Sequence, residues 1–71
     1  MKASGPSTLG AAIRARRQHL RLSQQALAEL AGVNRRVVGE LERGKQTVQL
    51  RIALRIARTL GLDLTVEDRE S

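Results

Sequence analysis

The sequence predicts a small all-α domain of four short helices, followed by one short β-strand. Between residues 9 and 60, apolar residues recur every three or four positions, as they do on one face of a helix. Three of these stretches end at a glycine (Gly32, Gly44 and Gly61), where a left-handed residue can terminate a helix. From residue 62 to 67 apolar and polar residues alternate, which is typical of a half-buried strand.

With 71 residues, the chain is expected to form one domain with a small core. Residues 1–8 are small and polar and predict a flexible arm, and residues 9–61 predict the folded domain. Residues 62–71 predict a strand and an acidic tail. The first helix is expected over Leu9–Leu20, with Ser7 or Thr8 as its N-cap and Leu9, Ile13 and Leu20 on its buried face.

The next two helices are short and lie close together in the sequence. Ser23 predicts the start of one, with Leu27, Ala28 and Ala31 as its apolar face and Gly32 at its end. Asn34 predicts the start of the other over Arg35–Arg43, with Val38 and Leu41 buried and Gly44 after it. Two helices joined by a short turn that contains glycine form a helix-turn-helix.

The last helix is expected over Val48–Leu60, with Thr47 as its N-cap. Its predicted buried residues are Leu50, Ala53, Leu54, Ile56, Ala57 and Leu60. Arg51, Arg55 and Arg58 follow at helical spacing and form a basic stripe. This stripe is either a solvated face or a contact surface for a partner or for phosphate.

The charge of the chain is strongly asymmetric. Residues 1–62 carry 12 Lys or Arg and 3 acids, whereas residues 63–71 carry 1 and 4. Such a basic domain matches a phosphate backbone. The chain has no Phe, Tyr or Trp on which single-stranded bases could stack, and this favours duplex DNA as the partner. The absence of cysteine and of a signal-like or membrane-length apolar segment predicts a cytoplasmic, nucleoid-associated protein.

Residues 9–61 resemble the XRE/Cro family of repressors. The resemblance rests on Leu20, Leu22-Ser23-Gln24, Leu27-Ala28, Gly32-Val33, Leu41-Glu42-Arg43-Gly44-Lys45 and Leu60-Gly61. It implies a four-helix, lambda-repressor-like domain whose second motif helix reads DNA in the major groove.

The resemblance also implies which residues contact DNA. In that family a Gln at the position of Gln24 binds phosphate, and residues at the positions of Arg43 and Lys45 do the same. Arg35 and Arg36 occupy base-reading positions, where an arginine can donate two hydrogen bonds to guanine, although one of them could bind phosphate instead. The predicted DNA-contacting residues are Gln24, Gln25, Asn34, Arg35, Arg36, Val37, Glu40, Arg43 and Lys45.

Specific roles are predicted for Val37 and Glu40, and for the pair Arg17 and Glu42. Val37 could touch a thymine methyl group, whereas Glu40 either contacts cytosine, orients an arginine or only pairs with Arg36 four residues earlier. Arg17 and Glu42 align with a partly buried Arg–Glu pair of the family that ties the first helix to the recognition helix. That role is structural.

The C-terminal strand narrows the resemblance to the HipB-like antitoxins, in which such strands pair in a homodimer. Leu62, Leu64 and Val66 are accordingly the predicted dimerisation residues, the alternative being that these leucines pack on the first helix. The narrower resemblance implies a repressor of its own operon with a HipA-like Ser/Thr kinase toxin as a possible partner. A phage-type or restriction–modification controller without a toxin is the other possibility.

The sequence predicts no catalysis and no cofactor. His19 is the only histidine, and neither cysteine nor an acidic cluster accompanies it, so no metal site or nucleophile–base pair is expected.

Overall fold

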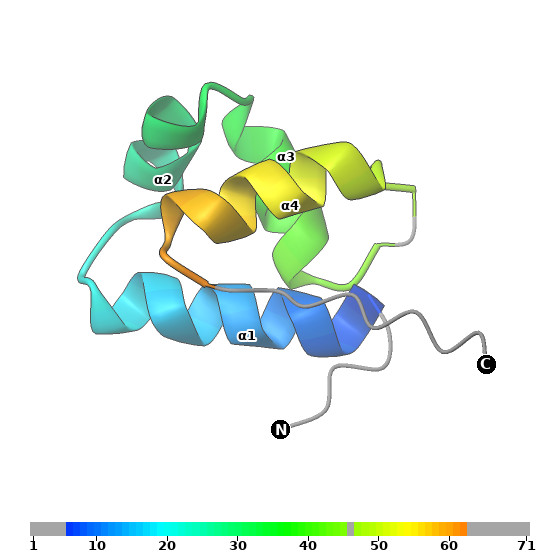
Figure 1. The fold of residues 1–71 in the computed structure, drawn as a ribbon, viewed down its shortest axis with the longest axis horizontal. Helices are drawn as coiled ribbons and strands as arrows, with labels where there is room; N and C mark the ends of the chain where they lie inside the picture. The colour runs from blue at the N-terminus through cyan, green and yellow to red at the C-terminus, as the bar shows by residue number, and fades with distance from the viewer. Residues whose placement is uncertain (1–5, 46, 63–71) are drawn as a thin grey trace, which may run out of the picture.

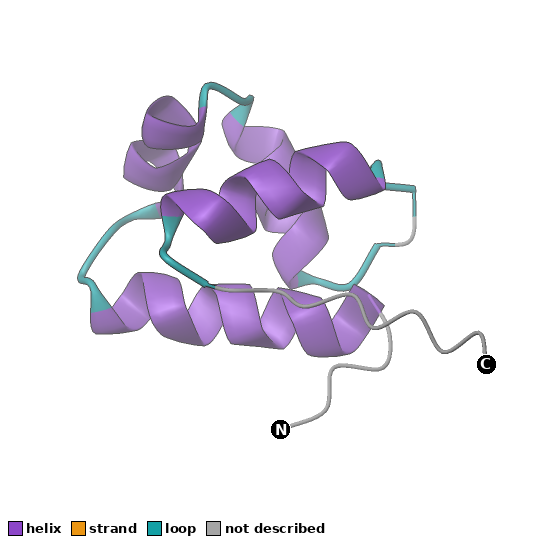
Figure 2. Ribbon diagram, viewed as in Figure 1, coloured by secondary structure: helices purple, strands orange, loops and turns teal. Residues whose placement is uncertain are grey.

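The computed structural model describes residues 6–45 and 47–62. They form four helices, α1 (Pro6–His19), α2 (Gln24–Ala31), α3 (Arg35–Glu42) and α4 (Leu50–Thr59). As Figure 1 shows, α1 lies along one side of the domain and α4 crosses in front of α3. Every regular element of this described part is a helix (Figure 2), so the predicted all-α class is confirmed.

The starts of α2 and α3 follow the predicted capping. The Ser23 hydroxyl accepts a hydrogen bond from the backbone N–H of Ala26 at 2.9 Å. The Asn34 side-chain oxygen accepts one from the N–H of Arg36 at 2.8 Å. Each cap satisfies a backbone donor that has no partner inside its helix.

The predicted starts of the other two helices are wrong. α1 begins at Pro6, so Ser7 and Thr8 lie inside the helix and not at its N-cap position. Proline suits the first helical position because its fixed φ is helical and its missing N–H would be unpaired there. α4 begins at Leu50 rather than Val48, and its N-cap is Gln49, which makes no side-chain capping bond, rather than Thr47.

All four helices end in the same hydrogen-bond motif. Beyond each helix, a backbone N–H donates to the carbonyl oxygen five residues earlier, which closes a Schellman motif. The four donor–acceptor pairs are Leu22 to Arg17, Val33 to Ala28, Lys45 to Glu40 and Leu62 to Ala57, at 2.9–3.0 Å. The motif needs one left-handed residue, and three of the four ends supply glycine (Gly32, Gly44 and Gly61), as predicted.

Arg21 supplies the left-handed residue at the end of α1, with φ of 59°. Because this conformation costs an L-residue about 1–2 kcal/mol, Arg21→Gly should stabilise the fold by roughly 0.5–1 kcal/mol after the greater backbone entropy of glycine is subtracted. The expected result in thermal unfolding is a Tm higher by roughly 2–6 °C. Arg14→Gly, the same substitution inside α1, should lower the Tm. Equal effects at both positions would show that residue 21 carries no strain.

The core is formed by residues from every helix. Ile13, Leu27, Val38 and Ile56 are fully buried, and Leu60, just after α4, is 2% exposed. Ala28, Ala31, Leu41, Ala53 and Ala57 complete the buried set, as predicted. The apolar pattern of the sequence therefore identifies most of the core.

Two leucines predicted to be buried are exposed instead. Leu50, the first residue of α4, is 64% exposed. Leu20 is 41% exposed, because α1 ends at His19 and the chain turns away from the predicted helical face. Leu54, also predicted to be buried, is half-buried.

Leu62, the first residue of the predicted strand, belongs to the end of α4. Its backbone N–H donates a hydrogen bond to the Ala57 carbonyl oxygen, and its side chain packs against the core. The rest of the strand, including Leu64 and Val66, lies outside the described residues, as does most of the arm over residues 1–8.

Two features of α1 connect it to the rest of the domain. The Arg16 Nε donates to the carbonyl oxygen of Leu60 at 3.0 Å, and so binds the C-terminal end of α4. Gly10 lies against α3 so closely that a Cβ atom there would overlap the carbonyl oxygen of Leu41.

In the described part of the chain, no helix has the length and apolar character needed to cross a membrane.

Candidate nucleic-acid interface

The predicted helix-turn-helix is formed by α2 and α3. Residues 32–34 join the two helices, which pack against each other around Leu27, Ala31 and Val38. Arg35 and Arg36, the first two residues of α3, are both exposed. Positively charged side chains at an exposed helix N-terminus add to the partial positive charge of the helix dipole, which favours an anion.

A hollow of about 440 Å³ lies between the start of α2 and the exposed face of α3. Its lining consists of Gln24, Arg35, Arg36, Gly39 and Arg43. Three guanidinium groups thus surround one open, polar depression. Gly39 contributes no side chain, and a Cβ there would lie 3.4 Å from a guanidinium nitrogen of Arg43. Four predicted DNA contacts, Gln24, Arg35, Arg36 and Arg43, are thereby brought together.

Other predicted contact residues already have intramolecular roles. Asn34 uses its side-chain oxygen to cap α3. Gln25 donates to Glu29 at 2.9 Å on the exposed side of α2. Val37 is partly buried and packs against the core, so it offers less surface for a thymine methyl group than the sequence suggested.

Glu40 forms two ion pairs with neighbouring predicted contact residues. Its Oε2 lies 3.4 Å from the Nε of Arg36 and 3.3 Å from the Nζ of Lys45. The pairing with Arg36, one of the three roles considered for Glu40, is therefore present in the free protein.

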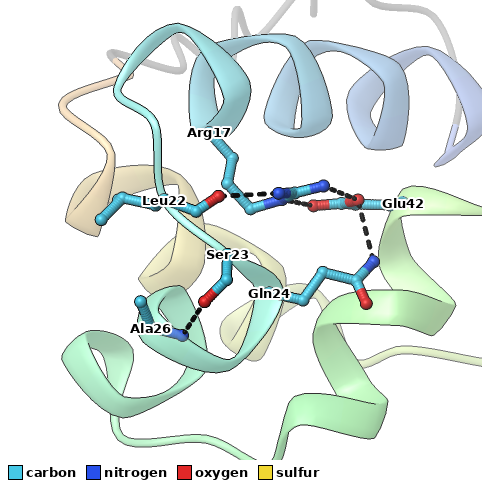
Figure 3. Close-up of polar contacts among 6 residues, drawn as sticks. All are labelled: Arg17, Leu22, Ser23, Gln24, Ala26 and Glu42. Carbon is cyan, nitrogen blue, oxygen red and sulfur yellow. Dashed lines mark hydrogen bonds and ion pairs between the residues drawn. The ribbon is translucent and has the colours of Figure 1, made fainter.

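Arg17 and Glu42, expected to form a partly buried pair, do so and join α1 to α3 (Figure 3). The Arg17 Nε donates to one carboxylate oxygen at 2.6 Å and an Nη donates to the other at 3.0 Å. The other Nη donates to the carbonyl oxygen of Leu22 at 2.8 Å. The two side chains are 11% and 4% exposed. Hydrogen bonding to Glu42 raises the pKa of Arg17 above its usual value, so the guanidinium stays charged at any physiological pH.

The sequence did not reveal that Gln24 joins this pair. The Gln24 side-chain amide donates to Glu42 at 3.1 Å, so one buried carboxylate holds residues from both α1 and α2 (Figure 3). Because the amide nitrogen faces Glu42, the orientation of the side chain is fixed at the edge of the hollow. Residues 24 and 42 are too far apart in the chain for a helical spacing rule to predict the contact.

Within residues 6–45 and 47–62, no group of three or more His, Asp or Glu side chains could hold a metal ion. His19 is exposed at the end of α1.

A family model described as helix-turn-helix matches residues 13–66. The chain belongs to this family. An uncharacterized HTH-type transcriptional regulator, y4mF of Sinorhizobium fredii, is 38% identical over 61 residues, 86% of this chain and 80% of that protein. Another from Methanothermobacter thermautotrophicus is 47% identical over 49 residues, 69% of this chain and 71% of that protein. The chain is a DNA-binding transcriptional regulator, not an enzyme.

Solved structures agree with the fold. HipB in a complex described as "HipB-O4 20mer" superposes with a TM-score of 0.85, at 24% identity and 99% coverage of both chains. A chain of a HipA-HipB-O2-O3 complex gives the same TM-score and coverage. The four-helix arrangement is therefore that of HipB.

Proposed function

We propose that the protein is a transcriptional repressor that binds duplex DNA as a homodimer and reads a two-fold-symmetric operator. The observation that carries the proposal is the exposed first turn of α3, with Arg35 and Arg36 beside a hollow that a third arginine, Arg43, also lines. A recognition helix meets base edges through such N-terminal residues, and arginine pairs with guanine in the major groove.

Phosphate contacts would surround this reading surface. Arg43 and Lys45 stand at the exit of α3, and the backbone N–H groups at the start of α2, beside Gln24, have no partner within the helix. These groups would fix the register of α3 on the duplex, and Arg35 and Arg36 would supply sequence preference.

Dimerisation is proposed through residues 62–71. A strand at Leu64 and Val66 would pair with its copy across a two-fold axis, since a lone strand leaves its backbone groups unpaired. Two recognition helices would then enter successive major grooves about 34–36 Å apart.

Within this function, the protein would be the antitoxin of a HipA-like kinase. The support is the likeness to HipB, which is found in complexes with both DNA and HipA. The second candidate is a phage-type or restriction–modification controller without a toxin. Co-expression with a kinase encoded in the same operon separates the two, because an antitoxin would co-purify with the kinase and a controller would not.

Removing an arginine that reads a base should weaken the preference for one DNA sequence and leave much of the non-specific binding. Arg35→Ala and Arg36→Ala should each lose about 1–3 kcal/mol of discrimination if that residue reads guanine, and only lower the salt slope by about one if it binds phosphate. The measurement is a footprint on the DNA upstream of the gene, with affinities determined at several salt concentrations.

Arg14→Ala is the matched control, since it removes the same charge from the exposed surface of α1. The wild type and this control should protect a discrete, symmetric site. If both arginine variants keep full preference for that site, α3 is not the reading helix. If the folded wild type protects nothing, the proposed repressor function is wrong.

A further inference from the structure

The Glu40 carboxylate has an unusual position within the basic surface of α3. One of its oxygens, Oε2, pairs with Arg36 on the preceding turn and with Lys45 in the loop beyond the helix. The Glu40 side chain is 18% exposed, whereas those of Arg36 and Lys45 are 81% and 50% exposed. A shielded carboxylate thus holds two exposed cations that are both predicted to touch DNA.

The other carboxylates of the described residues cannot take this role. Glu42 is buried and is already bonded to Arg17 and Gln24. Glu29 lies on α2, where it accepts from Gln25. Glu40 is therefore the one acidic group of residues 6–45 and 47–62 that pairs with cations on the reading surface.

We propose that Glu40 is a specificity-determining residue that positions Arg36 for guanine and restrains Arg36 and Lys45 from binding phosphate indiscriminately. This inference rests on the proposed DNA-reading function. The shortest contact to Glu40 is from the Nε of Arg36, at 3.4 Å, and neither Nη of Arg36 donates a hydrogen bond within the described residues. These two groups can donate in parallel to O6 and N7 of guanine, the pairing that distinguishes guanine from other bases.

The same carboxylate weakens contacts that carry no sequence information. A phosphate near Arg36 or Lys45 lies well within the screening length of about 8 Å from Glu40, so the carboxylate repels it. Each cation would also meet a phosphate with part of its charge already balanced by Glu40. Arg35 and Arg43 line the same hollow, and within the described residues neither forms an ion pair. Glu40 therefore restrains neither of them, and Arg43 in particular is available for phosphate.

The test is Glu40→Gln, which keeps the shape of the side chain and removes its charge. Wild type and variant are each selected on a random 20-base-pair duplex library, and affinities are then measured for the selected duplex and a shuffled duplex of equal composition. The variant should bind the shuffled duplex about 3–10-fold more tightly, since two exposed ion pairs no longer compete. Its salt slope should increase by about one to two. The ratio of selected to shuffled affinity should fall about tenfold.

Glu29→Gln is the matched control, because it makes the same change in net charge on α2. If Glu29→Gln binds the shuffled duplex more tightly by the same factor as Glu40→Gln, the change in net charge alone explains the tighter binding, and the proposal is overturned. The second control places Glu40→Gln in an Arg36→Ala background, where the affinity ratio should fall no further. A further tenfold fall there would mean that Glu40 contacts a base itself, which also overturns the positioning role.

The outcomes separate this inference from the proposed function. A wild type that selects no sequence contradicts the repressor proposal as a whole. A wild type that selects a sequence, with an affinity ratio unchanged in a folded Glu40→Gln variant, contradicts only the role of Glu40. Circular dichroism and the Tm establish folding for each variant.

Discussion

Glu42→Ala is expected to cost about 3–5 kcal/mol of the free energy of unfolding, because it leaves the buried guanidinium of Arg17 without its counter-charge. Arg17 is 11% exposed, and within the described residues its one other acceptor is the Leu22 carbonyl, at 2.8 Å. Gln24 loses its acceptor in the same variant. For a domain of this length, total stability is about 4–10 kcal/mol, so between about a third and all of it would be lost.

Urea unfolding followed by circular dichroism measures this loss. Arg17→Ala should have a similar effect, since it strands the carboxylate instead. Glu40→Ala is the matched control, because it removes the same side chain from the same helix, and its exposed pairs contribute about 0–1 kcal/mol. A loss below about 1 kcal/mol for Glu42→Ala would contradict the stabilising role of the buried pair.

An apolar replacement of both partners tests the physical cause. In Arg17→Met/Glu42→Leu no charge remains to be stranded, so stability should recover well above that of either single alanine variant. Gln24 would still lack its acceptor, and recovery should therefore be incomplete. If the double variant is as unstable as Glu42→Ala, the loss arises from packing and not from an unpaired charge.

Features governed by local chemistry were predicted well from the sequence. Ser23 and Asn34 cap their helices because a side-chain oxygen reaches an N–H two or three residues ahead, whatever the rest of the fold does. Gly32 takes the left-handed conformation for a similarly local reason. The prediction of Thr47 as the N-cap of α4 was wrong: Gln49 holds that position without a side-chain capping bond, so a good capping residue nearby does not by itself decide where a helix starts.

Features that depend on distant residues could not be predicted in this way. The spacing of Arg36 and Glu40 predicted their contact, but the loop geometry that adds Lys45 has no such signal. The arginines of α3 were identified from the sequence, whereas the hollow exists only because the start of α2 lies beside them. Arg21 carried no sequence signal at all, since arginine rarely adopts a positive φ.

Gly10 is the position at which an added methyl group should harm the fold most, although alanine is the better helix former by about 1 kcal/mol. A Cβ on Gly10 would overlap the Leu41 carbonyl oxygen and lie 3.0 Å from that of Glu42. Both are backbone atoms at the end of α3, so relief requires α1 and α3 to move apart. Such overpacking costs about 1–3 kcal/mol or more, which exceeds the gain in helix propensity.

Gly39→Ala is the matched control, because it makes the same change inside another helix. There the nearest atoms are the ends of the Arg43 and Gln24 side chains, at 3.4 Å or more, and the exposed arginine can move. Thermal unfolding should therefore show opposite signs, with a Tm lower by about 4–8 °C for Gly10→Ala and higher by a few degrees for Gly39→Ala. A higher Tm in both variants would mean that helix propensity decides and that α1 does not need glycine to approach α3. If the two Tm changes have the expected signs, Gly10→Ala displaces α1 and so also separates Arg17 from Glu42. The double variant Gly10→Ala/Glu42→Ala should then be destabilised by less than the sum of the two single effects.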